Sequence, residues 1–274
     1  MTINCKGQLI DLSQPKVMGI LNITPNSFFD GGRYSTDEEI LAKVEKMLDE
    51  GATFIDIGAY SSKPSAEFVT EEEELNRIVP VVQLLVKHFP KILISIDTFR
   101  SEVAKACIEN GAAIINDISA GNLDDKMLSV IAQYNVPYIM MHMRGTPQTM
   151  QTFTQYDDVV KDVLLYFSEK VSQARSLGIN DLIIDPGFGF AKTMEQNYEV
   201  MQKLELFHNL ELPLLVGISR KSMIHKTLGI SADDALNGTT FLNTIALTKG
   251  AHILRVHDVA AAMECVKLYE KLNS

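Results

Sequence analysis

Short apolar runs alternate with longer amphipathic stretches along almost the whole chain. The runs lie at residues 17–21, 53–55, 92–96, 113–115, 137–141, 182–184, 213–217 and 252–254. They are too short to form helices, and isoleucine and valine, which favour buried strands, are frequent in them. The pattern therefore predicts eight buried β-strands.

The stretches between these runs have the period of helices. Thr36 with Glu39, and Thr70 with Glu73, have the spacing of capping boxes, which predicts helices that begin there. The first helix should end at Gly51, and the second should run to about Phe89 with a kink at Pro80. The other predicted helices end near residue 111 or span residues 124–134 and 156–177, then 194–207, two stretches up to 249, and a last one to 272.

Eight strands that alternate with helices predict an α/β fold, a (β/α)8 TIM barrel. The length of 274 residues agrees with the roughly 250 that are typical of this fold. We expect a single domain over residues 1–274, with residues 2–12 as an N-terminal extension or hairpin that closes the bottom of the barrel. A doubly wound open sheet is the alternative, but it usually has fewer strands, and the first strand here is not followed by a G-x-G-x-x-G loop.

Charge and cysteine content narrow the class of protein. The net charge of −10 argues against a nucleic-acid backbone as the main partner. Cys5, Cys107 and Cys265 are too few and too scattered for a disulfide framework or a zinc site, which indicates a reducing compartment. No secretion signal is visible near the N-terminus, and no apolar run approaches the roughly 20 residues of a membrane span. We expect a cytoplasmic protein with no membrane or nucleic-acid partner.

A polar or charged residue follows nearly every predicted strand. In chain order these residues are Asn22, Asp56, Asp97, Asn116, His142, Asp185, Lys221 and Arg255, with His257 two positions on. The carboxyl ends of barrel strands meet at one mouth, where barrel enzymes carry their active sites. The set therefore predicts a site at the mouth, although His142 and Asp56 are the members that best fit a purely structural role.

The residue types limit the ligand. Asp97, Asn116 and Asp185 offer acceptors and an amide that suit a heterocycle with adjacent N–H donors. Lys221 can bind a carbonyl or ring nitrogen, and the flat guanidinium of Arg255 can cover an aromatic face. Asn22, Arg255 and His257 form a cluster suited to a phosphate, with or without a metal. The sequence has no Ser-His-Asp arrangement and no HExxH, so a covalent enzyme intermediate is not expected.

Seven motifs carry a resemblance to a known family. They are GILNITPNSF (19–28), IDT (96–98), INDI (115–118), MHMRGTP (141–147), DPGFGF (185–190), GISRKS (217–222) and RVHDV (255–259). In this order and at these spacings the chain resembles the dihydropteroate synthases of folate synthesis along almost its whole length.

The resemblance implies a reaction and a site. The family condenses a dihydropterin pyrophosphate with 4-aminobenzoate, giving dihydropteroate and pyrophosphate. The implied catalytic groups are Asp97, Lys221 and Arg255, and the implied pterin-binding residues are Asp97, Asn116, Met140, Asp185, Phe190, Gly217, Lys221 and Arg255. The implied aminobenzoate residues are Ser62, Lys63, Pro64, Phe190 and Ser222. Pyrophosphate would bind Asn22, Lys63, Arg255 and His257, with Mg²⁺ on Asn22, in a homodimer formed by helices within residues 232–272.

The chain departs from the family at two places. Tyr60 stands where a glutamate is usual, and Lys63 replaces an arginine. Ala191 replaces a common glycine after Phe190. Two other classes of protein share parts of the pattern: a pterin-dependent methyltransferase on the same barrel, and a barrel that only binds pterin. The methyltransferase would not need the loop over residues 22–28 or the run at residues 219–221, and the barrel that only binds pterin would not need the pyrophosphate residues. Release of pyrophosphate from the two substrates would separate the three.

Overall fold

Eight parallel strands form the centre of the computed structural model, which describes residues 1–23, 36–60 and 69–274. The strands are β3 (Lys16–Asn22), β4 (Phe54–Gly58), β5 (Ile94–Asp97), β6 (Ile114–Asp117), β7 (Tyr138–Met141), β8 (Leu182–Asp185), β9 (Leu215–Val216) and β10 (Ile253–Val256). They occur in the order β8-β7-β6-β5-β4-β3-β10-β9, and every neighbouring pair is parallel. A parallel bridge between Ile184 and Leu214 joins the two ends of this order and closes the barrel.

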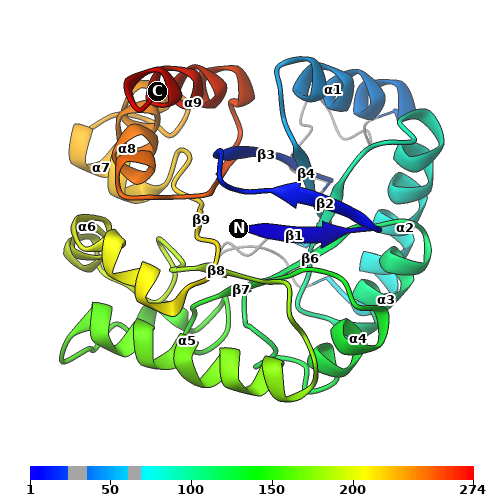
Figure 1. Ribbon diagram of the computed structural model, residues 1–274, viewed down its shortest axis with the longest axis horizontal. Coiled ribbons are helices and arrows are strands. Elements are labelled where there is room, and N and C mark those ends of the chain that lie inside the picture. Colours follow the sequence, from blue (N-terminus) through cyan, green and yellow to red (C-terminus); the bar gives the residue numbers. More distant parts are fainter. Residues whose placement is uncertain (24–35, 61–68) are drawn as a thin grey trace.

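Helices follow the strands and surround the barrel (Figure 1). They are α1 (Asp37–Asp49), α2 (Glu71–His88), α3 (Ser101–Glu109), α4 (Met127–Tyr134), α5 (Val159–Ser176), α6 (Met194–Gln202), α7 (Ser222–Leu228), α8 (Leu236–Thr248) and α9 (Val259–Leu272), with short 3-10 helices η1 (Met150–Thr152) and η2 (Leu204–Leu210). The predicted (β/α)8 barrel is confirmed. The predicted helix over residues 194–207 is divided between α6 and η2. Among the described residues, none of the helices has the length and apolarity needed to cross a membrane.

The two predicted capping boxes have different outcomes. Thr36 accepts a hydrogen bond from the backbone of Glu39, whose side chain binds back to Thr36, so the first box is complete. Thr70 caps Glu73 in the same way, but the Glu73 carboxylate pairs with Arg77 one turn further on. An i,i+4 partner of opposite charge competes for the glutamate. The helix α2 continues through Pro80.

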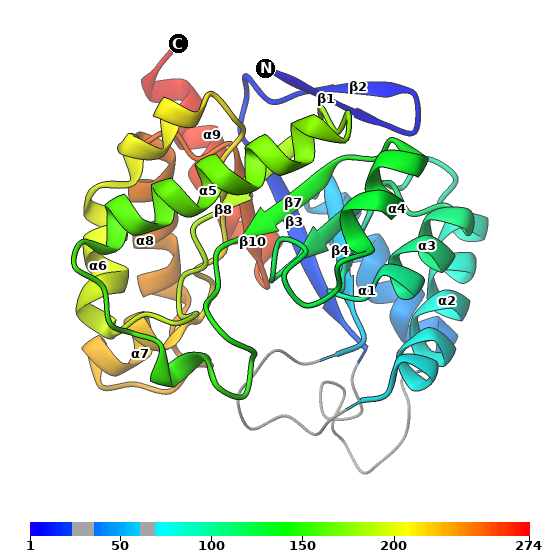
Figure 2. The same cartoon turned by 90° about the horizontal axis from the view of Figure 1, so that it is seen from below.

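An N-terminal hairpin closes one end of the barrel, as predicted. Strands β1 (Thr2–Cys5) and β2 (Gln8–Asp11) are antiparallel and are joined at Lys6 and Gly7, which both have positive φ, as a two-residue hairpin turn requires. The apolar side of the hairpin packs in one cluster with buried residues at or near the beginning of the strands: Met18, Phe54, Ala113, Ile114, Ile139, Ile183, Leu215 and Ile253. Figure 2, at right angles to Figure 1, shows the hairpin at one end of the barrel.

Candidate active site

The candidate site lies at the carboxyl ends of the strands, one layer above the apolar cluster that contacts the N-terminal hairpin. Side chains alternate between the two faces of a strand, so residues two positions apart point to the same side. Two positions beyond the apolar layer, the inward-facing residues become polar or charged. They include Asp56, Asn116, Asp185 and Arg255, which follow Phe54, Ile114, Ile183 and Ile253. Strand alternation therefore brings residues from distant parts of the chain together at the mouth.

Arg255 is held between two carboxylates. Its Nε donates to Asp56 Oδ2 at 2.6 Å, and its Nη2 donates to Asp97 Oδ2 at 2.7 Å. Asn116 Nδ2 donates to the same Asp56 oxygen at 3.1 Å. Asp56 is completely buried and contacts both Arg255 and Asn116 within the same layer. Although burial opposes the charge, Asp56 and Asp97 raise the pKa of Arg255, and the guanidinium stays protonated.

Burial also changes the protonation of the acids and the lysine at the mouth. It raises the pKa of Asp97 to about 7, although Arg255 acts in the opposite direction. Burial raises the pKa of Asp185 as well, against Lys221 and the Gly187 N–H, which donates to Asp185 Oδ1 at 2.8 Å. The same burial lowers the pKa of Lys221 to about 8. Raised pKa values of acids beside a lysine with a lowered pKa are common in binding and catalytic sites.

The loop after β8 forms one wall of the site. The Phe190 ring is half-buried, and Lys221 Nζ lies 4.9 Å from its centroid. Lys221 Nζ donates to the Phe188 carbonyl, which holds it beside Asp185. The predicted aminobenzoate residue Ser222 is exposed at the start of α7.

Small residues leave room between these groups. A Cβ built on Gly217 would lie 3.8 Å from both Arg255 Cβ and Asp185 Oδ2, so a side chain there would fill the space between them. At Gly58 a Cβ would lie 3.6 Å from Asp97 Oδ2 and 3.7 Å from Asn22 Oδ1. The Asn22 amide oxygen and the Asp97 carboxylate thus lie on the same side of the Gly58 backbone.

His257 lies at the rim of the site, beyond the end of β10. It is exposed, and its Nδ1 is 3.0 Å from Ser219 Oγ, which also accepts from the His257 N–H at 3.2 Å. The first contact orients the imidazole, and the second links the His257 backbone to the same hydroxyl.

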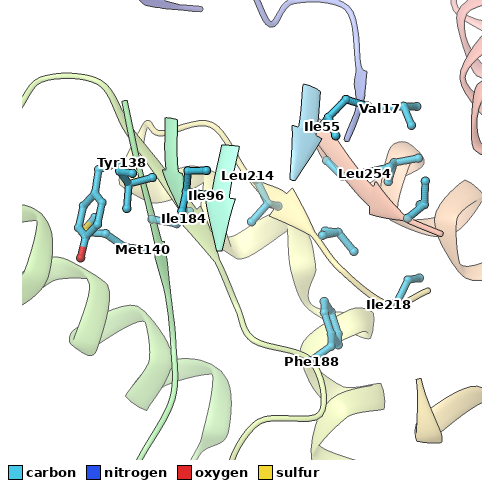
Figure 3. Close-up of a cluster of buried hydrophobic side chains, with 14 of the residues drawn as sticks. Val17, Ile55, Ile96, Tyr138, Met140, Ile184, Phe188, Leu214, Ile218 and Leu254 are labelled. Carbon is cyan, nitrogen blue, oxygen red and sulfur yellow. The ribbon is translucent and has the colours of Figure 1, made fainter. Parts of the chain in front are cut away.

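One predicted pterin residue is wrong by one position. Met140 packs in the layer between the barrel and the helices, together with Tyr138 and Ile184 (Figure 3). Ile139 points into the barrel, so alternation places Met140 on the outer side and Met141 on the inner one. Met141 is the register partner of Asp185 and packs in one cluster with Phe190. Met141, rather than Met140, therefore faces the candidate site.

Comparison with known proteins identifies the family. A family model described as pterin binding enzyme matches residues 18–257. The dihydropteroate synthase of Escherichia coli K12 is 42% identical over 272 residues, which cover 98% of this chain and 96% of that enzyme. That of Bacillus subtilis 168 is 40% identical over 93% of this chain and 88% of its own length.

The chain belongs to the dihydropteroate synthase family. Solved structures of the family agree with the barrel described above. The Yersinia pestis enzyme in a sulfonamide drug complex matches with a TM-score of 0.94 and 40% identity, over 100% of this chain and 99% of its own. The Xanthomonas albilineans enzyme with 4-aminobenzoic acid gives 0.93 and 36%, and with 7,8-dihydropteroate 0.90 and 35%. Each covers 100% of this chain, and this chain covers 98% and 99% of them.

The loop after β4, where the chain departs from the family motif, is described only as far as Tyr60. The predicted aminobenzoate residues Ser62, Lys63 and Pro64 lie outside the described residues. Tyr60, in place of the usual glutamate, is buried, packs edge-on against Phe99 at 5.3 Å and accepts a hydrogen bond from Gln148 Nε2 at 2.8 Å.

Some residues of the site were missed or undervalued at the sequence level. Asp56, for which the sequence favours a structural role, contacts both Arg255 and Asn116, and these contacts have no signal in the sequence. Met141 lies two positions after Ile139, so strand alternation places the two side chains on the same face. Lys192, beneath the loop after β8, had no signal in the sequence, since a lysine after a turn is ordinarily exposed.

Proposed function

We propose that this chain condenses 6-hydroxymethyl-7,8-dihydropterin pyrophosphate with 4-aminobenzoate, giving 7,8-dihydropteroate and pyrophosphate. The observation that carries the proposal is the buried charged layer at the mouth, in which Arg255 lies between Asp56 and Asp97, with Asn116, Asp185 and Lys221 in the same layer or beside it. The reaction is inferred from the family to which the chain belongs. The charged layer contains hydrogen-bond donors and acceptors that suit a pterin.

The pterin edge would be bound by acids and an amide. Asp185 has one oxygen held by the Gly187 N–H, and its carboxylate would accept from the 2-amino and N3 positions of the pterin. Asn116 presents its amide on the same layer, and Lys221 would donate to a carbonyl or ring nitrogen. Met141 and Phe190 would provide the apolar contacts to the ring system.

The C–O bond to pyrophosphate would break largely before the amine attacks. This route needs no protein nucleophile, because a dihydropterin can delocalise the positive charge that develops. Asp97 is placed to stabilise this charge. The arylamine nitrogen then forms the new C–N bond and loses one proton, and pyrophosphate carries away the electron pair of the broken bond. No covalent enzyme intermediate is needed.

The leaving group would be held at the rim by Asn22, Arg255, His257 and Lys63. The residues fit Mg²⁺, because the Asn22 amide oxygen is a hard donor beside the Asp97 carboxylate, and this ion usually takes few protein ligands and keeps water and phosphate oxygens. No cluster of three or more His, Cys, Asp or Glu side chains that could hold a metal occurs among the described residues. When bound, the ion would neutralise charge on the departing pyrophosphate. The amine would bind against Phe190, Ser222 and residues 62–64.

Release of pyrophosphate on mixing the two substrates tests the proposal. We expect release that requires both substrates and Mg²⁺, together with a product that has the mass of dihydropteroate. A pterin-dependent methyltransferase, the alternative, would transfer a methyl group and release no pyrophosphate. Pterin binding without any release would instead indicate a barrel that only binds pterin.

We also propose a cytoplasmic homodimer that binds sulfonamides in place of aminobenzoate. Exposed apolar side chains on the last two helices support the dimer: Leu236, Phe241, Leu268 and Leu272, with Phe241 63% exposed. All three cysteines are unpaired and buried, as expected in a reducing compartment.

Light scattering on the wild type and on Phe241→Asp tests the dimer interface, because a charge at position 241 should shift the measured mass towards that of one chain.

A further inference from the structure

Lys192 is a buried lysine beneath the loop after β8, and the reaction proposed above does not use it. It is only 4% exposed. Its Nζ lies 2.9 Å from His142 Nδ1, 3.1 Å from the Gly187 carbonyl oxygen and 3.2 Å from the Phe190 carbonyl oxygen. Burying an amine is costly unless its polar atoms find partners, and here three partners surround it.

The loop that Lys192 contacts has an unusual backbone. Gly187, Gly189 and Ala191 have φ of 71°, 82° and 48°, so three of five consecutive residues are left-handed. At Gly187 a side chain is impossible, because a Cβ would lie 2.1 Å from the His142 carbonyl oxygen. At Ala191 the left-handed conformation costs roughly 1–2 kcal/mol and persists only where the surroundings enforce it.

Two lysines donate hydrogen bonds to backbone carbonyls of this loop. Lys192 binds those of Gly187 and Phe190, and Lys221 binds the Phe188 carbonyl between them. The loop therefore connects a lysine outside the proposed site to one inside it, and it also carries the Phe190 ring beside Lys221.

We propose that Lys192, supported by His142, is a positioning residue that fixes the loop after β8 so that Phe190 and Lys221 are correctly placed for the reaction. This inference rests on the proposed function. It assigns a task to two residues that touch neither substrate, and it explains why a lysine is buried at this point.

The arrangement works in both protonation states of Lys192. Burial lowers the pKa of Lys192 to about 7 and that of His142 well below its usual value, with Asp185, Lys221 and Arg144 as the neighbouring charges. The ammonium form donates to both carbonyls and to His142 Nδ1. The neutral amine still has two N–H groups for the carbonyls, and it can accept from His142 Nδ1–H in the other tautomer.

The experiment compares Lys192→Met with a matched control, Lys203→Met. Lys203 is a half-exposed lysine at the end of α6 that pairs with Glu199 and, more distantly, with Asp158. With steady-state rates and calorimetric pterin binding, we expect Lys192→Met to raise the KM for aminobenzoate at least about tenfold, because small displacements of positioning groups have large effects. The Kd for pterin should rise less, since Asp185 remains. The control should stay within about twofold of the wild type.

If Lys192→Met fails to fold, two variants of His142 test the same proposal. His142→Asn retains an acceptor near the place of Nδ1 and should keep the KM for aminobenzoate within a few fold, whereas His142→Leu should raise it. Variants that fold with wild-type KM and kcat, or that lose only thermal stability, overturn the positioning role. A wild type that releases no pyrophosphate refutes the proposed function instead, so the two failures are distinguishable.

Discussion

Two inward-facing layers of the same barrel have opposite chemistry although they are only two residues apart along each strand. The lower layer contains Phe54, Ile114, Ile183 and Ile253, packed against the N-terminal hairpin. The upper layer contains Asp56, Asn116, Asp185 and Arg255. One step of strand alternation, roughly 6–7 Å, separates them.

The difference indicates that the lower layer stabilises the barrel, whereas the upper layer serves binding and reaction. Burying apolar area in the lower layer stabilises the fold. The upper layer buries charge, which raises the pKa of Asp97 and Asp185 and lowers that of Lys221. Such burial costs stability unless the ion pairs are well made. We therefore expect substitutions in the lower layer to affect unfolding and substitutions in the upper layer to affect binding and rate.

The largest expected effect is in the lower layer. Phe54 is completely buried, and Phe54→Ala should lower the free energy of unfolding by about 3–5 kcal/mol through lost burial and the resulting cavity. Urea denaturation measures this change. Below the unfolding transition, the Kd for pterin and the kcat should stay within about twofold of the wild type. A large change in kcat without loss of stability would remove the distinction between the layers.

The next effect is in the upper layer. Asp185→Asn replaces a charge-assisted acceptor by an amide, so pterin binding should weaken by roughly 2–4 kcal/mol in a calorimetric titration. Because burial raises the pKa of Asp185, its charge costs stability, and the variant should unfold at the same or a higher urea concentration. Unchanged pterin affinity would show that Asp185 does not bind the ligand.

A smaller effect, on kcat rather than on the Kd for pterin, is expected at Asp97. Asp97→Asn removes the charge proposed to stabilise the developing cation, so kcat should fall about ten- to a hundredfold while the Kd for pterin rises less. Burial raises the pKa of Asp97 to about 7, so wild-type kcat should fall as pH drops through that value, and the variant should lack this limb. Equal losses in pterin affinity and kcat/KM with unchanged kcat would make Asp97 a binding residue only.

The sequence predicts the lower layer and the strand ends well, because both depend on local pattern. The eight apolar runs gave the barrel, and the residues after them gave Asp97, Asp185 and Arg255. The resemblance implies Met140, whereas Met141 points inward, because a shift of one residue turns a side chain to the opposite face. The contacts of Asp56 and Lys192 involve residues far away in the chain, so no local pattern could reveal them.

Lys192 gives the most specific test of buried charge near the mouth of the barrel. Burial lowers its pKa to about 7, whereas an unfolded lysine titrates near 10.5. Between these values the unfolded chain binds more protons than the folded one, so this group makes the folded state more stable as pH rises. The difference in unfolding free energy between wild type and Lys192→Met should therefore move in favour of the wild type from pH 7 to pH 9.5, by at most about 1.4 kcal/mol per pH unit. Urea denaturation at several pH values measures it, with Lys203→Met as the control that should show no such slope. A difference that is flat with pH would mean that Lys192 keeps an ordinary pKa despite its burial.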